Sequence, residues 1–245
     1  MATPHSGTPT GVGLVLASGA AHGAAHAGVL RAIEEAGIEV SVVTGTSAGA
    51  LIGGVWAAGI SEERITERLL AVQWADFGST AISPRLGLLD TTPFARNFEE
   101  LVGDLLIEEL PTTFGAVVTE LGSATPRLVS SGPLAAAVRA SSAVPGLFPP
   151  VRVDGVLCVD GAVVSPSPVW AAHRLGAQRI IAVGFGETSR WRRWFESRPG
   201  HPARGLRADL TITIDPGGNS AWSAVGVPDL IDRGYRTTRD ALKEL

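Results

Sequence analysis

The stretch from Ile38 to Gly59, IEVSVVTGTSAGALIGGVWAAG, decides which kind of fold this chain adopts. Its first part, residues 38–44, is rich in β-branched apolar residues and predicts a buried strand. Its last part, residues 48–58, is small and apolar and predicts a helix. Between them lies Gly45–Thr46–Ser47–Ala48–Gly49, a G-x-S-x-G sequence at a strand-to-helix turn. In α/β enzymes such a turn exposes a nucleophilic serine at the edge of the sheet.

Ser47 is therefore the candidate nucleophile. Gly45 and Gly49, two positions before and after it, leave room where a Cβ atom would clash in a tight turn. A helix that begins at Ala48 directs the positive end of its dipole at the serine, which favours negative charge on a bound carbonyl oxygen. The alternative is a glycine-rich turn with an ordinary serine, because a five-residue motif needs its structural context to be specific.

The rest of the chain continues the alternation of strands and helices. Residues 11–17 predict a strand, residues 18–23 a turn of small residues, and residues 22–36 a helix that Gly37 caps. This order is typical of a parallel sheet covered by helices. Further strands are predicted at 116–121, 127–131, 151–153, 156–159, 179–184 and 210–214, and further helices from 61 onward and at 133–141, 168–175 and 228–245. Residues 76–112 are predicted to be irregular, with short helical pieces at 93–102.

Composition and charge exclude several classes of protein. Of the 245 residues, 45% are hydrophobic and 18% are charged, which excludes a disordered, collagen-like or long coiled-coil chain. The formal net charge of −4 argues against a nucleic-acid partner. A single cysteine, Cys158, excludes an internal disulfide and a cysteine-based zinc site. Without a repeat or a clear linker, we expect a flexible tail over residues 1–10 and a single domain over residues 11–245.

The sequence also bears on cellular location. Residues 1–30 contain no Lys, Arg, Asp or Glu, so the positive start of a secretory signal is missing. A second charge-free stretch, residues 40–61, is about as long as a membrane span. Its five glycines and its small polar residues are better explained by a strand, a turn and a buried helix. We expect a cytoplasmic protein, with peripheral membrane contact left open.

A nucleophilic serine needs a proton acceptor, and Asp160 is the candidate. It ends the strand predicted at 156–159 and is followed by Gly161 and Ala162, small residues that let a substrate or another backbone approach the carboxylate. Asp154 is the contrasting case, because Asp154–Gly155 between two short alternating runs predicts a hairpin turn. An aspartate serves as a base toward an alcohol only where burial makes it a stronger acceptor.

A Ser–Asp–His triad is formally available as Ser47, Asp160 and either His173 or His201. Two observations argue against it. Only one predicted strand, at residues 11–17, precedes the strand that leads into Ser47, whereas an α/β-hydrolase needs several, and neither histidine lies in a glycine-marked turn.

Four ordered segments together resemble one family: LASGAAHGAAHAGVL (16–30), GTSAG (45–49), ASSAVPGLFPPV (140–151) and VDGAVV (159–164). They resemble the bacterial patatin-like phospholipases, acyl hydrolases that use a Ser–Asp dyad. The resemblance implies a three-layer α/β/α fold with a mostly parallel central sheet, with Ser47 as the nucleophile and Asp160 as its base. It also implies a lipid or acyl-ester substrate and no metal or cofactor.

The resemblance further implies that the turn Ser18–Ala21 forms an oxyanion hole through the backbone amides of Gly19, Ala20 and Ala21. Consecutive small residues between a strand and a helix suit such an anion-binding nest. A dinucleotide-binding turn is the competing interpretation, but its G-x-G-x-x-G spacing is absent. This chain departs from the family pattern in two ways. Ala17, Ser18 and Ala20 stand where the family has more glycines, and His22 stands where it has Arg or Lys.

Residues 188–207 concentrate positive charge and aromatic rings, with Arg190, Trp191, Arg192, Arg193 and Trp194 adjacent. This segment is a candidate for peripheral contact with anionic lipid. A solvated loop with packed aromatic residues is the simpler interpretation.

Taken together, the sequence predicts a serine esterase or lipid acyl hydrolase that works through an acyl-enzyme. An acyltransferase or thioesterase on the same dyad and a non-catalytic regulator with the same fold are the alternatives.

Overall fold

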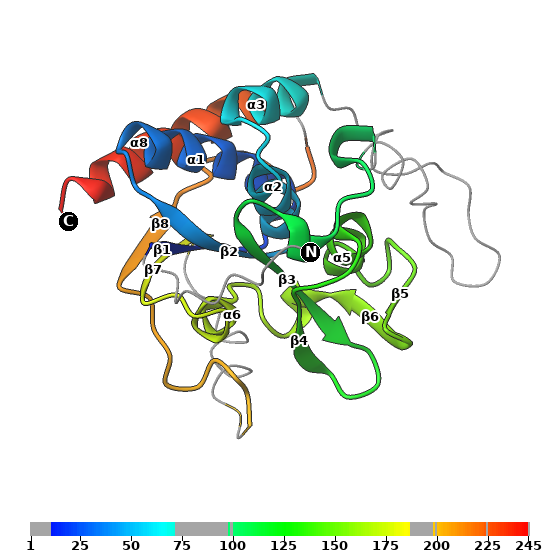
Figure 1. Ribbon diagram of the computed structural model, residues 1–245. Helices are drawn as coiled ribbons and strands as arrows, with labels where there is room; N and C mark the ends of the chain where they lie inside the picture. Colours follow the sequence, from blue (N-terminus) through cyan, green and yellow to red (C-terminus); the bar gives the residue numbers. More distant parts are fainter. Residues whose placement is uncertain are drawn as a thin grey trace.

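A mixed β-sheet runs through the centre of the molecule (Figure 1). The computed structural model describes residues 11–71, 98, 100–186, 198, 200–223 and 225–244. Within these residues the sheet has eight strands in the order β5-β6-β3-β2-β1-β7-β8, and β4 also pairs with β3. The strands are β1 (Val12–Leu16), β2 (Val40–Thr46), β3 (Thr113–Glu120), β4 (Thr125–Val129), β5 (Val151–Val153), β6 (Val156–Asp160), β7 (Arg179–Phe185) and β8 (Leu210–Ile214).

The central strands are parallel and one side of the sheet is antiparallel. β3, β2, β1, β7 and β8 pair in parallel, whereas β4 and β6 run antiparallel to β3, and β5 runs antiparallel to β6. The carboxyl ends of the parallel strands therefore meet at one edge, where open α/β sheets place their ligands.

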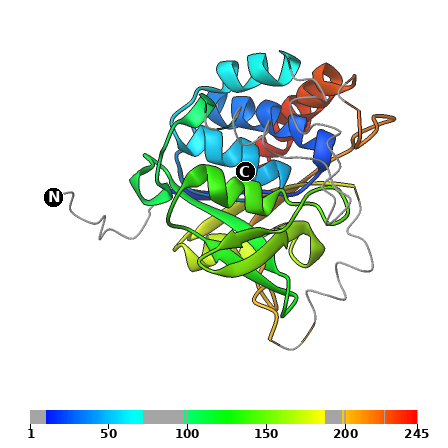
Figure 2. The same ribbon diagram turned by 90° about the vertical axis from the view of Figure 1, so that its right-hand side faces the viewer.

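Helices cover both faces of this sheet (Figures 1 and 2). The longer helices lie on one face, and α6 lies on the other. The α-helices are α1 (Ala25–Glu35), α2 (Ala48–Ala57), α3 (Glu62–Ala71), α5 (Leu134–Ser141), α6 (Val169–Arg174) and α8 (Val227–Leu242). Short 3₁₀ helices are η1 (Ala20–Ala24), η3 (Ile107–Glu109) and η4 (Gly161–Val163). The predicted three-layer α/β/α fold with a mostly parallel sheet is confirmed.

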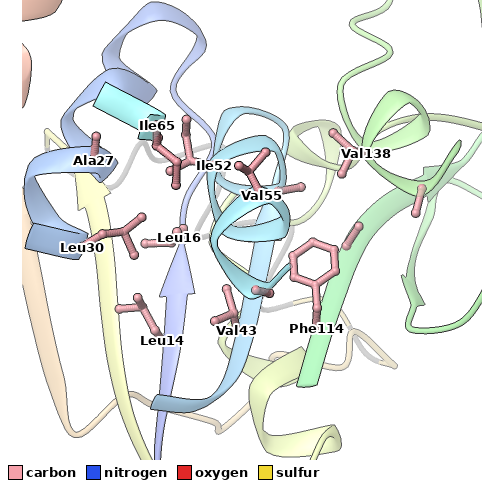
Figure 3. Close-up of a cluster of buried hydrophobic side chains, with 14 of the residues drawn as sticks. Leu14, Leu16, Ala27, Leu30, Val43, Ile52, Val55, Ile65, Phe114 and Val138 are labelled. Atoms are coloured by element: carbon pink, nitrogen blue, oxygen red, sulfur yellow. The ribbon is translucent and has the colours of Figure 1, made fainter. Parts of the chain in front are cut away.

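The core follows from the alternation of side chains along β1. Leu14 and Leu16 are fully buried and point to the face covered by α1 and α2, where Phe114 of β3 joins them (Figure 3). Val15 points the opposite way and packs in the cluster that contains Ala172 of α6. Since both faces of a central parallel strand are buried, its sequence is an uninterrupted apolar run rather than an alternating one.

Most predicted boundaries lie within a few residues of the observed ones. One difference lies at the carboxyl end of β1. The helix predicted from His22 begins at Ala25, because residues 20–24 form the tighter turn of η1. Its other end is as predicted: Gly37 has a φ of +65°, its N–H donates to Glu34 O, and Ile38 N–H donates to Ile33 O. These two bonds form a Schellman motif, which ends a helix.

Two further segments bear on the predictions. Asp154 and Gly155 both have positive φ, at 47° and 80°, and join β5 to β6 as the predicted hairpin turn. Within residues 100–112 of the segment predicted to be irregular, η3 forms, whereas residues 72–97 and the tail at 1–10 lie outside the described residues. No helix among the described residues is both long and apolar enough to cross a bilayer.

Two glycines allow α1 and α8 to pack with their backbones in contact. A Cβ atom on Gly28 of α1 would lie 1.9 Å from Ile231 O, and one on Gly234 of α8 would lie 2.0 Å from Ala25 O. Neither obstacle is a flexible side chain, so a larger residue must separate the helices.

We expect Gly234→Ala to lower the free energy of unfolding by about 1–3 kcal/mol, because overpacking forces a backbone shift. Denaturant unfolding measures this loss. Gly122→Ala is the matched control, since a Cβ atom there meets nothing within 4 Å. Equal effects of the two substitutions would contradict the close packing of α1 on α8.

Candidate active site

Ser47 lies on a sharp turn between β2 and α2. Its φ of 55° and ψ of −121° are unusual for a residue with a side chain. A Cβ atom on Gly45 would lie 2.4 Å from Gly49 C, and one on Gly49 would lie 2.0 Å from Leu16 O. The turn therefore depends on glycine at both positions. The backbone conformation of Ser47 directs its side chain away from the line of β2.

Asp160 meets this serine where the carboxyl ends of β2 and β6 come together, although 113 positions separate them in the chain. Ser47 Oγ donates a hydrogen bond of 2.7 Å to Asp160 Oδ2. β3 brings the two together, because Thr46 pairs with Val117 and Asp160 pairs with the next residue, Val118, on the same side of β3, while β4 pairs along its other side. Both side chains are buried, with Ser47 7% and Asp160 3% exposed.

The backbone around Asp160 fixes its carboxylate. Ala162 N–H donates to Asp160 Oδ1 at 2.7 Å, so each carboxylate oxygen has one donor. Thr119 Oγ1 donates to the carbonyl oxygen of Asp160 at 2.9 Å. A Cβ atom on Gly161 would lie 2.2 Å from Val117 O, so the Asp-Gly pair lets η4 start directly against β3.

Burial changes the acidity of this carboxyl group. Desolvation raises the pKa of Asp160 from 3.8 to about 6, and the hydrogen bonds from Ser47 and Ala162 oppose the shift. A carboxylate with a raised pKa still loses its proton at neutral pH and accepts one more readily than an exposed aspartate. The pair thus joins a hydroxyl to a base of increased strength.

Sequence reasoning missed Ser141, which holds the backbone of Ser47. Ser47 N–H donates to Ser141 Oγ at 2.9 Å, and Ser141 Oγ donates to Val117 O at 2.7 Å. Ser141 is fully buried at the end of α5. It lies within the segment 140–151 that carries part of the family resemblance, but no spacing rule connects it with residue 47.

The turn after β1 places backbone amides at the edge of the sheet where Ser47 lies. Ser18 N–H donates to Pro166 O and Ala21 N–H donates to Ala221 O, at 2.8 and 2.9 Å. Among the described residues, no backbone carbonyl accepts from Gly19 or Ala20. The Ala21 bond differs from the expectation that Ala21 shares the oxyanion hole, because an N–H that already donates has no second proton to offer.

His26 was also missed, and it supports this turn from beneath. It is fully buried, and its Nε2 donates to Ala17 O at 2.8 Å. Burial lowers the pKa of His26 to about 4, so the ring is neutral at pH 7. Phe185 lies against it with ring centroids 5.0 Å apart, and a Cβ atom on Gly19 would lie 2.5 Å from the Phe185 ring. Gly19 therefore occupies a position that excludes a side chain.

The other residues considered from sequence lie apart from this pair. His173 bonds Arg207 O and His201 Nε2 lies 3.2 Å from Val164 O, and no described histidine bonds Asp160. Asp154 is exposed on its hairpin and bonds Arg127. The basic and aromatic residues Arg190, Trp191, Arg192, Arg193 and Trp194 lie outside the described residues.

Comparison with known proteins identifies the family. The sequence model described as patatin-like phospholipase matches residues 14–173, more than half of the chain. The chain belongs to this family. The match spans the turn after β1, the serine turn and the Asp-Gly segment, and it ends before β7 and α8.

Relatives of this patatin-like protein include bacterial and animal sequences. An uncharacterised NTE family protein of Mycobacterium bovis is 36% identical over 180 residues, covering 71% of this chain and 49% of that protein. The neuropathy target esterase of Drosophila melanogaster is 35% identical over 191 residues, covering 73% of this chain and 13% of the esterase. The chain thus spans about half of the mycobacterial relative and a small part of the fly protein.

Solved structures support the same fold. VipD from Legionella pneumophila matches with a TM-score of 0.61 over 96% of this chain and 67% of its own, at 17% identity. At that identity the similarity concerns the fold alone.

We expect the buried Asp160 carboxyl to make stability depend on pH. Because its pKa is higher in the folded state than its ordinary value, the folded state binds the proton more tightly, and stability falls as pH rises from about 4 to about 6. Urea unfolding measures the stability of wild type and of Asp160→Asn at pH 4 and at pH 8. Relative to the variant, wild type should lose up to about 3 kcal/mol of stability between pH 4 and pH 8. A difference that stays constant with pH would contradict the raised pKa.

Proposed function

We propose that this chain is a serine acyl hydrolase that cleaves carboxylic esters of lipids, with Ser47 as nucleophile and Asp160 as its base. The observation that carries the proposal is the 2.7 Å hydrogen bond from Ser47 Oγ to a buried carboxylate with a raised pKa. Membership in the patatin-like phospholipase family supports a lipid substrate. Covalent catalysis by serine requires a nucleophilic hydroxyl that is hydrogen-bonded to a base.

In the first half of the reaction, Ser47 Oγ attacks the ester carbonyl carbon and its proton passes to Asp160 Oδ2. The carbonyl oxygen becomes an oxyanion, which the amides of Gly19 and Ala20 and the positive end of α2 stabilise. When this tetrahedral intermediate collapses, the bond to the alcohol oxygen breaks, and Asp160 returns the proton to the departing alcohol. The product of this step is an acyl-enzyme on Ser47.

In the second half, water attacks the acyl carbonyl carbon and gives its proton to Asp160. The second tetrahedral intermediate expels Ser47 Oγ, which regains the proton from Asp160, and the carboxylic acid leaves. The same aspartate acts as base and then as acid in each half, so one carboxyl group completes the cycle. An acyltransferase or thioesterase would use the same acyl-enzyme with a different acceptor or donor.

We expect Ser47→Ala to abolish ester hydrolysis and labelling by a fluorophosphonate, because both need the Oγ nucleophile. Asp160→Asn should lower kcat/KM by at least about 10³-fold, since general-base catalysis is lost. Asp154→Asn is the matched control: it also removes an Asp-Gly carboxylate, on a hairpin away from the pair, and should keep most of the activity. Similar losses in the two aspartate variants would refute the assignment of the base.

A panel of substrates separates the alternatives. Fatty-acyl esters, phospholipids, acyl thioesters and an added alcohol acceptor are offered to wild type and to Ser47→Ala. Cleavage of esters with release of free acid supports the hydrolase, whereas transfer to the alcohol or preference for thioesters supports the alternative enzymes. Folded wild-type protein that neither reacts with the fluorophosphonate nor turns over any substrate would support a non-catalytic regulator.

We expect hydrolysis to require the ionised form of Asp160. Since its pKa is about 6, kcat/KM should fall about tenfold per pH unit below pH 6 and level off above pH 7. Rates with a soluble ester across pH 4.5 to 8.5 measure this profile. A profile that is flat through pH 6 would show that Asp160 is not the base.

A further inference from the structure

A segment outside the region matched by the family model bonds the proposed oxyanion turn. It consists of residues 215–223, here called the strap, and lies in the chain between β8 and α8. Ala21 N–H donates to the Ala221 carbonyl oxygen at 2.9 Å. His22 Nε2 lies 2.8 Å from the Asn219 carbonyl oxygen, so this nitrogen carries the proton and donates it. The strap therefore accepts one backbone and one side-chain hydrogen bond from two adjacent residues of the turn.

The strap is itself anchored to α8 through Asn219. The side-chain amide of Asn219 donates to Asp229 Oδ2 at 2.7 Å and to Pro216 O at 2.8 Å. Asp229 is fixed in turn by Arg233, whose Nε donates to the same oxygen at 2.6 Å. Gly226 leaves the space that Asn219 fills, because a Cβ atom there would lie 2.0 Å from Asn219 Oδ1. One side chain thus ties the strap to both its own backbone and the helix.

The turn that the strap contacts contains a strained residue. Ala20 has a φ of 48°, in the left-handed region that glycine adopts freely and alanine does not. Such conformations persist where the surrounding structure over-determines them. Donation from Ala21 N–H to the strap fixes the peptide plane between Ala20 and Ala21, and with it the ψ of Ala20.

We propose that the strap is a positioning element of the oxyanion hole, which holds Ala20 in its left-handed conformation so that the amides of Gly19 and Ala20 stay directed at the site. Asn219 is the positioning residue on which the strap depends. This inference rests on the proposed function in taking the turn as an oxyanion hole. It explains how the chain keeps that turn with alanine at position 20.

The test is a rescue experiment. Asn219→Ala removes both hydrogen bonds of the Asn219 side chain. We expect kcat for a soluble p-nitrophenyl ester to fall about tenfold with KM changed less than about twofold, because a misplaced donor weakens transition-state binding alone. Ala20→Gly added to Asn219→Ala should restore most of the lost kcat, since glycine adopts a positive φ without the strap. A merely structural role for Asn219 predicts no such recovery.

A second readout does not depend on catalysis. Hydrogen exchange followed by mass spectrometry should show faster exchange in peptides covering residues 18–24 in Asn219→Ala than in wild type. His22→Phe keeps an aromatic ring but removes the donor to Asn219 O, and should move kcat and exchange in the same direction if Asn219→Ala does not fold. Arg236→Ala is the matched control, because it breaks a surface ion pair of the same helix with Asp232 that does not involve the strap.

The outcomes separate the two proposals. If wild type has no esterase activity, but residues 18–24 exchange faster in Asn219→Ala than in wild type, the proposed function is overturned. The faster exchange would still show that the strap holds the turn. Exchange and kcat equal to wild type in Asn219→Ala, or no recovery on adding Ala20→Gly, would overturn the strap proposal and leave the dyad assignment intact.

Discussion

The bond between Ser47 Oγ and Asp160 Oδ2 depends on the pairing of three strands. β2 delivers the serine and β6 delivers the aspartate, and both strands pair along the same side of β3, where their carboxyl ends meet. A shift of one residue in the pairing of β2 or of β6 with β3 would turn the paired side chains to the opposite face of the sheet. The pair also requires a buried carboxylate, whose desolvation cost is offset only in part by the donors from Ser47 and Ala162. The surrounding sheet therefore stabilises an arrangement that is locally unfavourable.

Backbone strain occurs at both places where the chain leaves a strand toward this edge. Ser47 and Ala20 each have positive φ although neither is glycine. A hydrogen bond to a residue far along the chain supports each position: Ser141 accepts from the amide of Ser47, and Ala221 accepts from the amide of Ala21, which follows Ala20. Strained residues with external support are common at functional sites, because the strain directs groups that a relaxed turn would bury. The glycines at 19, 45, 49 and 161 complete the edge by allowing backbone and ring atoms to approach closely.

Local patterns in the sequence predicted much of this architecture. The strand-to-helix turn around Ser47, the Schellman motif at Gly37 and the hairpin at Asp154–Gly155 are set by interactions within a few residues, so their composition predicts them. The start of α1 was predicted three residues too early, because the tertiary bond from Ala21 to Ala221 accompanies a 3₁₀ turn that helical periodicity does not reveal. Ser141 and His26 were missed because their partners, Ser47 N–H and Ala17 O, are backbone groups. Every residue has such groups, so residue type does not predict which of them a side chain will bond.

The sequence by itself determined the helices and strands, the two candidate side chains Ser47 and Asp160, and the family to which the chain belongs, since these follow from residue types at short spacing. The tertiary structure decided the distance between the two side chains, the raised pKa of Asp160, the engagement of Ala21 and the contact of residues 215–223 with the turn after β1. Each of these depends on burial or on hydrogen bonds between residues tens to hundreds of positions apart. Such contacts exist only when the sheet has assembled and water has been removed from its edge.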